Sequence, residues 1–175
     1  MNAIPVLRLV RPVAAVLLLA ACGGGVPLPA PFPAPTGASG GGGSTGGTMT
    51  ASQETAEVAR LVNEHRARIG CRALVWDGAA ARAAQAHSND MARRDYFSHT
   101  SPEGQGMVDR LRAQGASYRM IAENIAFGQP TAREVVRGWL ASAGHRHNIE
   151  NCGYTHHGVG VNAKRWTHVF YTPLQ

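Results

Sequence analysis

The sequence contains no apolar run long enough to cross a lipid bilayer. Its most extended run, residues 12–21 (PVAAVLLLAA), has ten residues, whereas a membrane-spanning helix needs about 20 apolar residues. A run of this length that follows Arg8 and Arg11 is typical of the hydrophobic region of an export signal peptide. We therefore predict that the chain is exported.

The end of this run, Leu19-Ala20-Ala21-Cys22, resembles a bacterial lipobox. Small residues before the cleavage site fit the cleft of a signal peptidase, and the thiol of the cysteine that follows can carry a diacylglycerol. We predict that residues 1–21 are a lipoprotein signal peptide and that Cys22 anchors the chain to the membrane at the cell envelope, in the periplasm or on the cell surface. An ordinary signal peptide with an incidental cysteine agrees less well with the order of charge, apolar run, small residues and Cys. The sequence leaves inner and outer membrane open.

Cysteine is scarce, with three residues in the chain. Once Cys22 is assigned to the lipid, Cys71 and Cys152 remain, and two cysteines in an oxidising compartment usually pair. A catalytic thiol is the alternative, but neither residue has a catalytic context in the sequence. We predict a structural Cys71–Cys152 disulfide.

Lysine is almost absent, since Lys164 is the one lysine among 17 basic residues. Removing residues 1–21 takes away Arg8 and Arg11 and lowers the formal net charge from +6 to +4. The remaining arginines are scattered along the chain, which indicates a solvated surface with weak attraction to anionic envelope material. Because an exported protein does not meet nucleic acid, we expect no nucleic-acid partner.

Glycine and proline are concentrated in residues 22–52, first as VPLPAPFPAPTG and then as ASGGGGSTGGT. This segment has no apolar periodicity and cannot bury a core, so we predict a tether that begins at Cys22. Residues 53–175 have the size of one domain.

Within this domain, apolar residues recur at helical spacing in the first part of the sequence, and segments typical of strands come last. Thr50 and Asp77 are expected to cap helices, a third helix is expected to end at Gly115, and a fourth begins after Thr131 and ends at Gly144. Residues 120–127, 154–162 and 166–171 are expected to be extended, with a hairpin turn at 162–165. Gly158 and Gly160 would weaken a strand unless another backbone or a ligand approaches closely. Helices followed by a hairpin indicate an α+β domain.

Seven short segments occur in an order that resembles the CAP superfamily (cysteine-rich secretory, antigen 5, pathogenesis-related 1), in its bacterial SCP-like extracellular branch. They are 61–66 (LVNEHR), 74–77 (LVWD), 87–91 (HSNDM), 96–99 (YFSH), 122–126 (AENIA), 139–149 (WLASAGHRHNI) and 158–161 (GVGV). The resemblance covers nearly all of residues 55–172. It implies a single α-β-α sandwich with a small, mostly antiparallel sheet.

The resemblance also implies a cleft with two His and two acidic residues, which holds Zn²⁺ or Mg²⁺ in some members. His99 matches the first His and Glu123 matches the acid of the Glu-Asn pair. The sequence departs from the animal and plant pattern because Ser142 stands at the second acid and Arg165 at the second His. The bacterial branch instead has a His in its Gly-His-Arg segment, here His145. We therefore predict His99, Glu123 and His145 as the cleft residues and as the ligands of any metal.

Two imidazoles and one carboxylate suit Zn²⁺ with an open fourth position, and they also suit general acid–base chemistry. The alternative is that His99 and Glu123 form a buried structural pair, because a buried Glu must find partners. Three functions follow: a binding or interaction module for an apolar or polymeric envelope ligand, a metal-dependent hydrolase of peptides or envelope polymers, and a purely structural lipoprotein. Ser142 removes one acid that a hydrolase would use, so we favour binding and assign no catalytic residue.

The other histidines are expected to be less important. His87 is expected in the core or at its boundary, and His168 lies one step from the family's Gln position and could line the cleft. His147 and His145 would diverge on a helical turn.

Overall fold

The computed structural model describes residues 49–174. The predicted signal peptide, Cys22 and most of the predicted tether lie outside these residues. Nowhere between residues 49 and 174 does a helix combine the length and apolar character needed to span a membrane.

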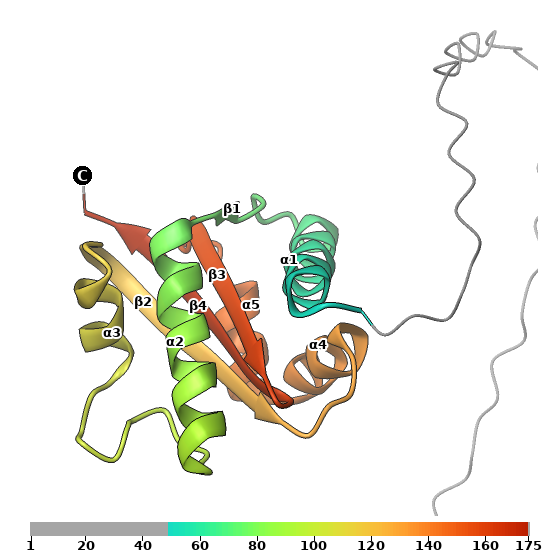
Figure 1. The fold of residues 1–175 in the computed structure, drawn as a ribbon. Coiled ribbons are helices and arrows are strands. Elements are labelled where there is room, and N and C mark those ends of the chain that lie inside the picture. Colours follow the sequence, from blue (N-terminus) through green and yellow to red (C-terminus); the bar gives the residue numbers. More distant parts are fainter. Residues whose placement is uncertain (1–48, 175) are drawn as a thin grey trace, which may run out of the picture. The chain divides into compact units, whose positions relative to one another are not determined.

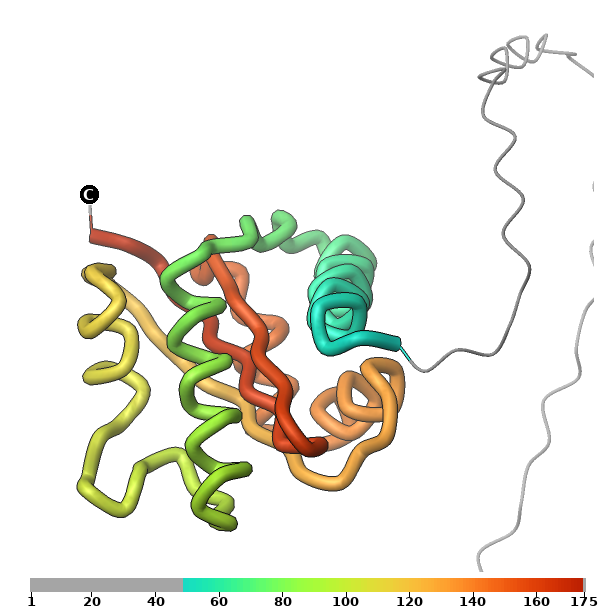
Figure 2. Tube along the Cα trace, viewed as in Figure 1, coloured from blue at the N-terminus to red at the C-terminus, as the bar shows by residue number. Residues whose placement is uncertain are grey.

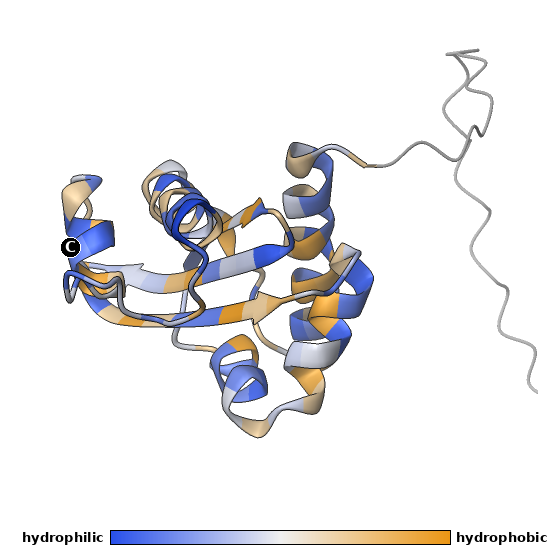
Figure 3. Cartoon of the chain, turned by 60° about the horizontal axis from the view of Figure 1, so that its bottom comes forward, coloured by the Kyte–Doolittle hydropathy of each residue, from blue (hydrophilic) through white to orange (hydrophobic). Residues whose placement is uncertain are grey.

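The described chain folds as five helices and one four-stranded sheet, which form the α-β-α sandwich expected from the sequence (Figures 1 and 2). In chain order the elements are α1 (Ala51–Arg68), β1 (Val75–Trp76), α2 (Gly78–Arg94), α3 (Met107–Ala113), β2 (Tyr118–Phe127), α4 (Ala132–Ala141), α5 (Ala143–Glu150), β3 (His156–Asn162) and β4 (Arg165–Pro173). In Figure 3, hydrophobic residues (orange) and hydrophilic residues (blue) are interspersed along the helices and strands.

The sheet has the strand order β1-β3-β4-β2, so β2 lies at one edge. β3 and β4 form the predicted antiparallel hairpin, closed at the Asn162–Arg165 pair by Ala163 and Lys164, which both have positive φ. β2 pairs antiparallel with β4. The two-residue β1, parallel to β3, was not predicted, because two exposed residues give no alternation to read.

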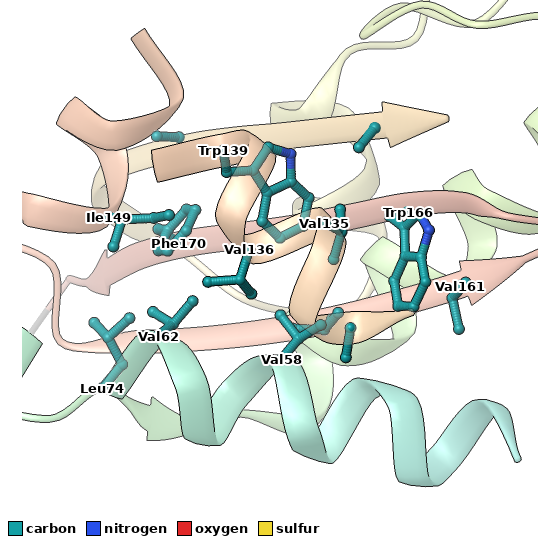
Figure 4. Close-up of a cluster of buried hydrophobic side chains, with 14 of the residues drawn as sticks. Val58, Val62, Leu74, Val135, Val136, Trp139, Ile149, Val161, Trp166 and Phe170 are labelled. Carbon is teal, nitrogen blue, oxygen red and sulfur yellow. The ribbon is translucent and has the colours of Figure 1, made fainter. Parts of the chain in front are cut away.

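The helices cover the two faces of the sheet (Figure 1). α2 and α3 pack on one face, where Leu111 and the alanines of α2 meet Val169 and Tyr171. α1, α4 and α5 pack on the other, where Val58 and Val62 of α1 meet a larger cluster around Trp139, Trp166 and Phe170 (Figure 4). Burial of large aromatic side chains makes this second layer the main hydrophobic core.

Helix α2 lies unusually close to β3 because two glycines face it. A Cβ added at Gly158 would lie 2.1 Å from Ala81 N, and one at Gly160 would lie 2.4 Å from Gln85 N. Neither position has room for a side chain. This confirms the expectation that another backbone approaches these glycines, and that backbone is α2.

Capping residues set the predicted starts of three helices, whereas one predicted helix end is wrong. Thr50 and Gln53 form a capping box, and Asp77 and Thr131 cap α2 and α4. α1 begins at Ala51, within the last two residues of the predicted tether. The expected helix end at Gly144 is wrong: α4 ends at Ala141, the extended Ser142 breaks the helix, and α5 runs through Gly144. Tertiary packing sustains α5, because Ile149 is fully buried and its carbonyl accepts a hydrogen bond from Arg66.

Arg66 is fully buried and ties α1 to the segment that follows it, to the end of α5 and to the segment between α5 and β3. Its guanidinium donates to the carbonyls of Arg72, Ile149, Asn151 and Tyr154. The predicted Cys71–Cys152 disulfide is confirmed beside it, with a Cα–Cα distance of 5.1 Å. Both links hold the chain that follows α1 against the chain that precedes β3.

Two adjacent strands bury a histidine pair in the core. His157 Nδ1 and His168 Nε2 lie 3.0 Å apart, and both side chains are at most 1% exposed. Burial, and then the charge of Arg66, lowers the pKa of His157 to about 4, and burial lowers the pKa of His168 as well. The pair is therefore neutral at pH 7. The expectation that His168 could line the cleft is wrong, because residue alternation turns its ring into the core.

Replacement of Gly158 by alanine should destabilise the protein by roughly 3 kcal/mol or more, because the new methyl group would overlap the α2 backbone. Urea unfolding of the two proteins measures the change. Gly138→Ala is the matched control, because a Cβ there meets nothing within 4 Å, and it should stabilise by up to about 1 kcal/mol. Equal stability of the Gly158→Ala variant and the unaltered protein would contradict this account of α2 packing.

Candidate functional site

Strand β2 presents one row of peptide groups to the free edge of the sheet. Just past its end, Gly128 N–H donates to Lys164 O, and in an antiparallel pair such bonded positions recur at every second residue. The even-numbered residues of β2 from 122 to 126 therefore bond to β4. The odd-numbered residues from 121 to 127 turn their N–H and C=O groups toward the edge.

Two carbonyls on this edge accept hydrogen bonds from side chains of the α4–α5 layer. Trp139 Nε1 donates to Ile125 O at 3.2 Å, and Asn148 Nδ2 lies 3.5 Å from Glu123 O. Asn148 also donates to the Asn124 side chain at 2.9 Å. These bonds fix α4 and α5 along one side of the edge.

Two hollows open along the same edge, and we call them together the edge groove. The first hollow, about 570 Å³, is lined by residues from both helical layers and from β2: His99, Thr100, Gly106, Met107, Val108, Ile121, Ala122, Glu123, His147, Asn148 and Tyr154. The second hollow, about 420 Å³, follows the next residues of β2: Phe97, Ile125, Ala126, Phe127, Gln129, Val135, Gly138, Trp139, Ser142 and His145.

A buried charge network forms the floor of the first hollow. The Glu123 side chain is 1% exposed, and its two oxygens have different partners. His99 Nδ1 lies 2.9 Å from Oε1, and Arg110 Nη2 donates to Oε2 at 2.8 Å. The His99 side chain is 54% exposed, so its ring connects the buried carboxylate to the groove.

These contacts keep Glu123 ionised. Burial by itself would raise the pKa of the Glu123 carboxyl, but the hydrogen bond from His99 and the charge of Arg110 outweigh it, and the pKa is lowered. An ionised carboxylate only accepts hydrogen bonds, so we assign the His99 proton to Nδ1. In the neutral imidazole, Nε2 is then a free acceptor directed away from Glu123.

Arg110 of α3 also anchors the loop that carries His99. Its guanidinium donates to His99 O and to Gln105 O, both at 3.0 Å, while it holds Glu123. His87, buried in α2 as expected, bonds through Nε2 to Ser98 O at 2.9 Å. The loop is therefore tied to α2, α3 and β2, which fixes the position of His99.

Arg165 holds the beginning of the same loop. Its side chain forms an ion pair with Asp95, donates to Tyr96 O at 3.4 Å and lies 4.4 Å from the ring centre of Phe127. The residue at the second His position of the animal and plant pattern thus has a positioning role. Sequence reasoning did not identify Arg110 or the partner of Arg165, because both interactions join segments far apart in the chain.

The structure brings two of the three predicted cleft residues together. His99 and Glu123 are bonded, whereas His145 lines the second hollow. Burial lowers the pKa of His145, and the charge of His99 lowers it further. His147 lines the first hollow, which agrees with the expected divergence of His145 and His147.

The predicted metal ligands do not make a ready three-ligand set. Across residues 49–174, no three His, Cys, Asp or Glu side chains are grouped so that they could hold a metal ion. Both Glu123 oxygens already have partners, and one partner is the cation Arg110. Metal binding by His99, Glu123 and His145 stays a prediction, and it would require Arg110 to leave the carboxylate.

Comparison with known proteins identifies the relatives of this chain. Residues 59–172 match the model of the cysteine-rich secretory protein family, CAP. The Bacillus subtilis protein YkwD, named as uncharacterized, is 38% identical over 129 residues, which are 73% of this chain and 50% of YkwD. The chain thus spans about half of the length of that relative.

Two solved structures share the fold. An extracellular protein from Bacillus anthracis that contains a SCP domain is 35% identical, with a TM-score of 0.67, over 71% of this chain and 44% of that chain. An outer surface protein from Borrelia burgdorferi has a TM-score of 0.66 at 17% identity, over 72% of this chain and 97% of that chain. The second similarity concerns the fold alone.

Replacement of Arg110 by methionine should leave Glu123 as a buried carboxylate without its cation and destabilise the protein by roughly 3–5 kcal/mol at pH 7. The loss should shrink below pH 4.5. A carboxyl with a lowered pKa contributes stability above its unfolded pKa, and this contribution is lost as Glu123 becomes protonated.

Urea unfolding at pH 7 and pH 4 measures both effects. Arg137→Met, on the exposed side of α4, is the control and should change stability by less than about 0.5 kcal/mol. A loss for Arg110→Met that is equal at both pH values would show that packing, and not charge compensation, is the role of Arg110.

Proposed function

The chain belongs to the cysteine-rich secretory protein (CAP) family, and from this membership we propose that it is an exported binding module that takes an extracytoplasmic ligand in the edge groove. In this proposal Cys22 carries a lipid that holds the domain at the cell envelope. The tether that follows Cys22 gives the groove access to envelope material.

Export is supported by sequence and by relationship. The charged start, short apolar run and lipobox-like Leu19-Ala20-Ala21-Cys22 occur in the order of a lipoprotein signal. The related Bacillus anthracis protein is described as extracellular. The Cys71–Cys152 disulfide suits an oxidising compartment.

The observation that carries the binding function is the His99–Glu123–Arg110 network beneath an open hollow. It uses a buried ion pair to hold one exposed imidazole in one tautomer and one position. If these residues served only to stabilise the fold, packed apolar side chains could replace them, because a buried ion pair is costly to desolvate. A fixed imidazole beside apolar side chains from α3 and β2 is suited to recognition of a ligand that has both polar and apolar parts.

The geometry favours binding over hydrolysis by a protein nucleophile. Among residues 49–174, no serine, threonine or cysteine side chain hydrogen-bonds to the His99 ring. Ser142 lines the second hollow, away from His99. A general base without a nucleophile or a polarising group would supply little catalysis.

A metal-dependent hydrolase is the second candidate, and one feature favours it. A histidine that donates a hydrogen bond from Nδ1–H to a carboxylate has Nε2 free, and this is the usual arrangement of a metal-ligating histidine. His99 would then bind the metal, Glu123 would orient His99, and the metal would supply Lewis-acid chemistry.

We expect a detergent-solubilised fraction of the producing cell's envelope to contain the ligand. When this fraction is added to the full chain, the ring signals of His99 in NMR spectra should shift, while those of His156, outside the groove, should not. Molecules retained after washing are identified by mass spectrometry, and His99→Ala should retain at least tenfold less of the specific ligand than His156→Ala. Equal retention by the two variants would exclude His99 as part of the binding site.

We expect calorimetric titration of the full chain with Zn²⁺ to show no one-to-one site of micromolar affinity, because Arg110 already compensates Glu123. His99→Ala provides the comparison. Tight binding that disappears in this variant would overturn the expectation and favour the hydrolase, and a search for zinc-dependent cleavage of peptides would follow.

A further inference from the structure

We propose that the occupant of the edge groove is an extended peptide with bulky apolar side chains at two positions four residues apart. The proposal names a ligand class for the groove and therefore rests on the proposed function. Three features of β2 and its surroundings carry it: unused backbone donors, the spacing of the two hollows and the charge of the walls.

The free edge of β2 offers hydrogen-bond donors. Trp139 and Asn148 already bond to the carbonyls of Ile125 and Glu123. By the alternation of an antiparallel pair, the N–H groups of the same two residues point to this edge and not to β4. The two donors are separated by two residues, or about 7 Å along the strand. The carbonyls of another extended backbone repeat at this spacing, so a peptide aligned with β2 can accept from both.

The two hollows are placed for side chains of such a peptide. β2 residues 121–123 line the first hollow and residues 125–127 line the second, so their centres lie four residues, or about 13 Å, apart. Met107 and Val108 make the first hollow apolar, and Phe97, Val135 and Trp139 make the second hollow apolar. In an extended chain, residues i and i+4 point to the same side and span this distance.

Each hollow also has polar side chains in its lining, which suits a peptide backbone. His99 and His147 line the first hollow and His145 lines the second, so polar rings lie beside the apolar side chains in both. Glu123 is the one acidic side chain that lines either hollow, and it is compensated by Arg110. An acyl chain would leave the N–H donors without acceptors, and the hydroxyl groups of a glycan do not repeat at the spacing of a strand.

Gly138 provides a way to block the second hollow without disturbing the core. It lies in α4, lines the hollow, and a Cβ there meets nothing within 4 Å. Leucine at this position should fill the hollow and also favour the helix. Gly144 of α5 has equally open surroundings but does not line either hollow, so Gly144→Leu is the matched control.

The test is selection of nine-residue peptides from a random display library on the full chain, followed by fluorescence anisotropy with the enriched peptides. We expect enrichment of apolar residues at i and i+4, at least tenfold weaker binding to Gly138→Leu, and binding within twofold of the unaltered protein for Gly144→Leu. Addition of an enriched peptide should shift the amide proton signals of Glu123 and Ile125 downfield as their N–H groups gain acceptors.

Absence of enrichment, equal binding to Gly138→Leu, or unmoved amide signals of Glu123 and Ile125 would overturn the peptide proposal. The binding function would survive such a result if the envelope fraction still gave a His99-dependent ligand that is not a peptide. If neither experiment gave a ligand that depends on the groove, both proposals would fail.

Discussion

The buried carboxylate of Glu123 is the constraint on which the groove side of the molecule depends. A charge with 1% exposure must be compensated, and the structure does this with His99 on one oxygen and Arg110 on the other. Arg110 in turn bonds to two carbonyls of the loop between α2 and α3. One buried charge thus connects β2, α3 and the loop, and it keeps an imidazole exposed at a fixed place.

The groove itself is a consequence of sheet topology. β4 pairs with both β3 and β2, while β2 ends the sheet, so the two helical layers meet there without a further strand between them. Trp139 and Asn148 close part of the edge from one layer, and Arg110 and the His99 loop close part of it from the other. The two hollows are the parts that remain open.

Away from the groove, the contacts between the helices and the sheet stabilise the fold. Gly158 and Gly160 bring α2 onto β3, and Arg66 with the Cys71–Cys152 disulfide ties α1 to the segment before β3. The neutral pair His157 and His168 lies among these contacts, so not every histidine of this chain belongs to the site. β4 pairs with both β3 and β2, and it carries the buried His168 as well as Arg165, which holds the His99 loop.

The sequence by itself determined where α1, α2 and α4 start, because the capping residues Thr50, Asp77 and Thr131 act on their own helix within one turn. It also determined the hairpin, the α+β class, the disulfide pair and the family, since two spare cysteines and an ordered set of motifs are readable along the chain. Tertiary structure decided the rest: the short β1, the helix through Gly144, the burial of His168, the separation of His145 from Glu123, and the partnership of Arg110 with Glu123. These features depend on contacts between segments far apart in the chain, and local sequence carries no signal for an ion pair whose partners meet only when the layers close.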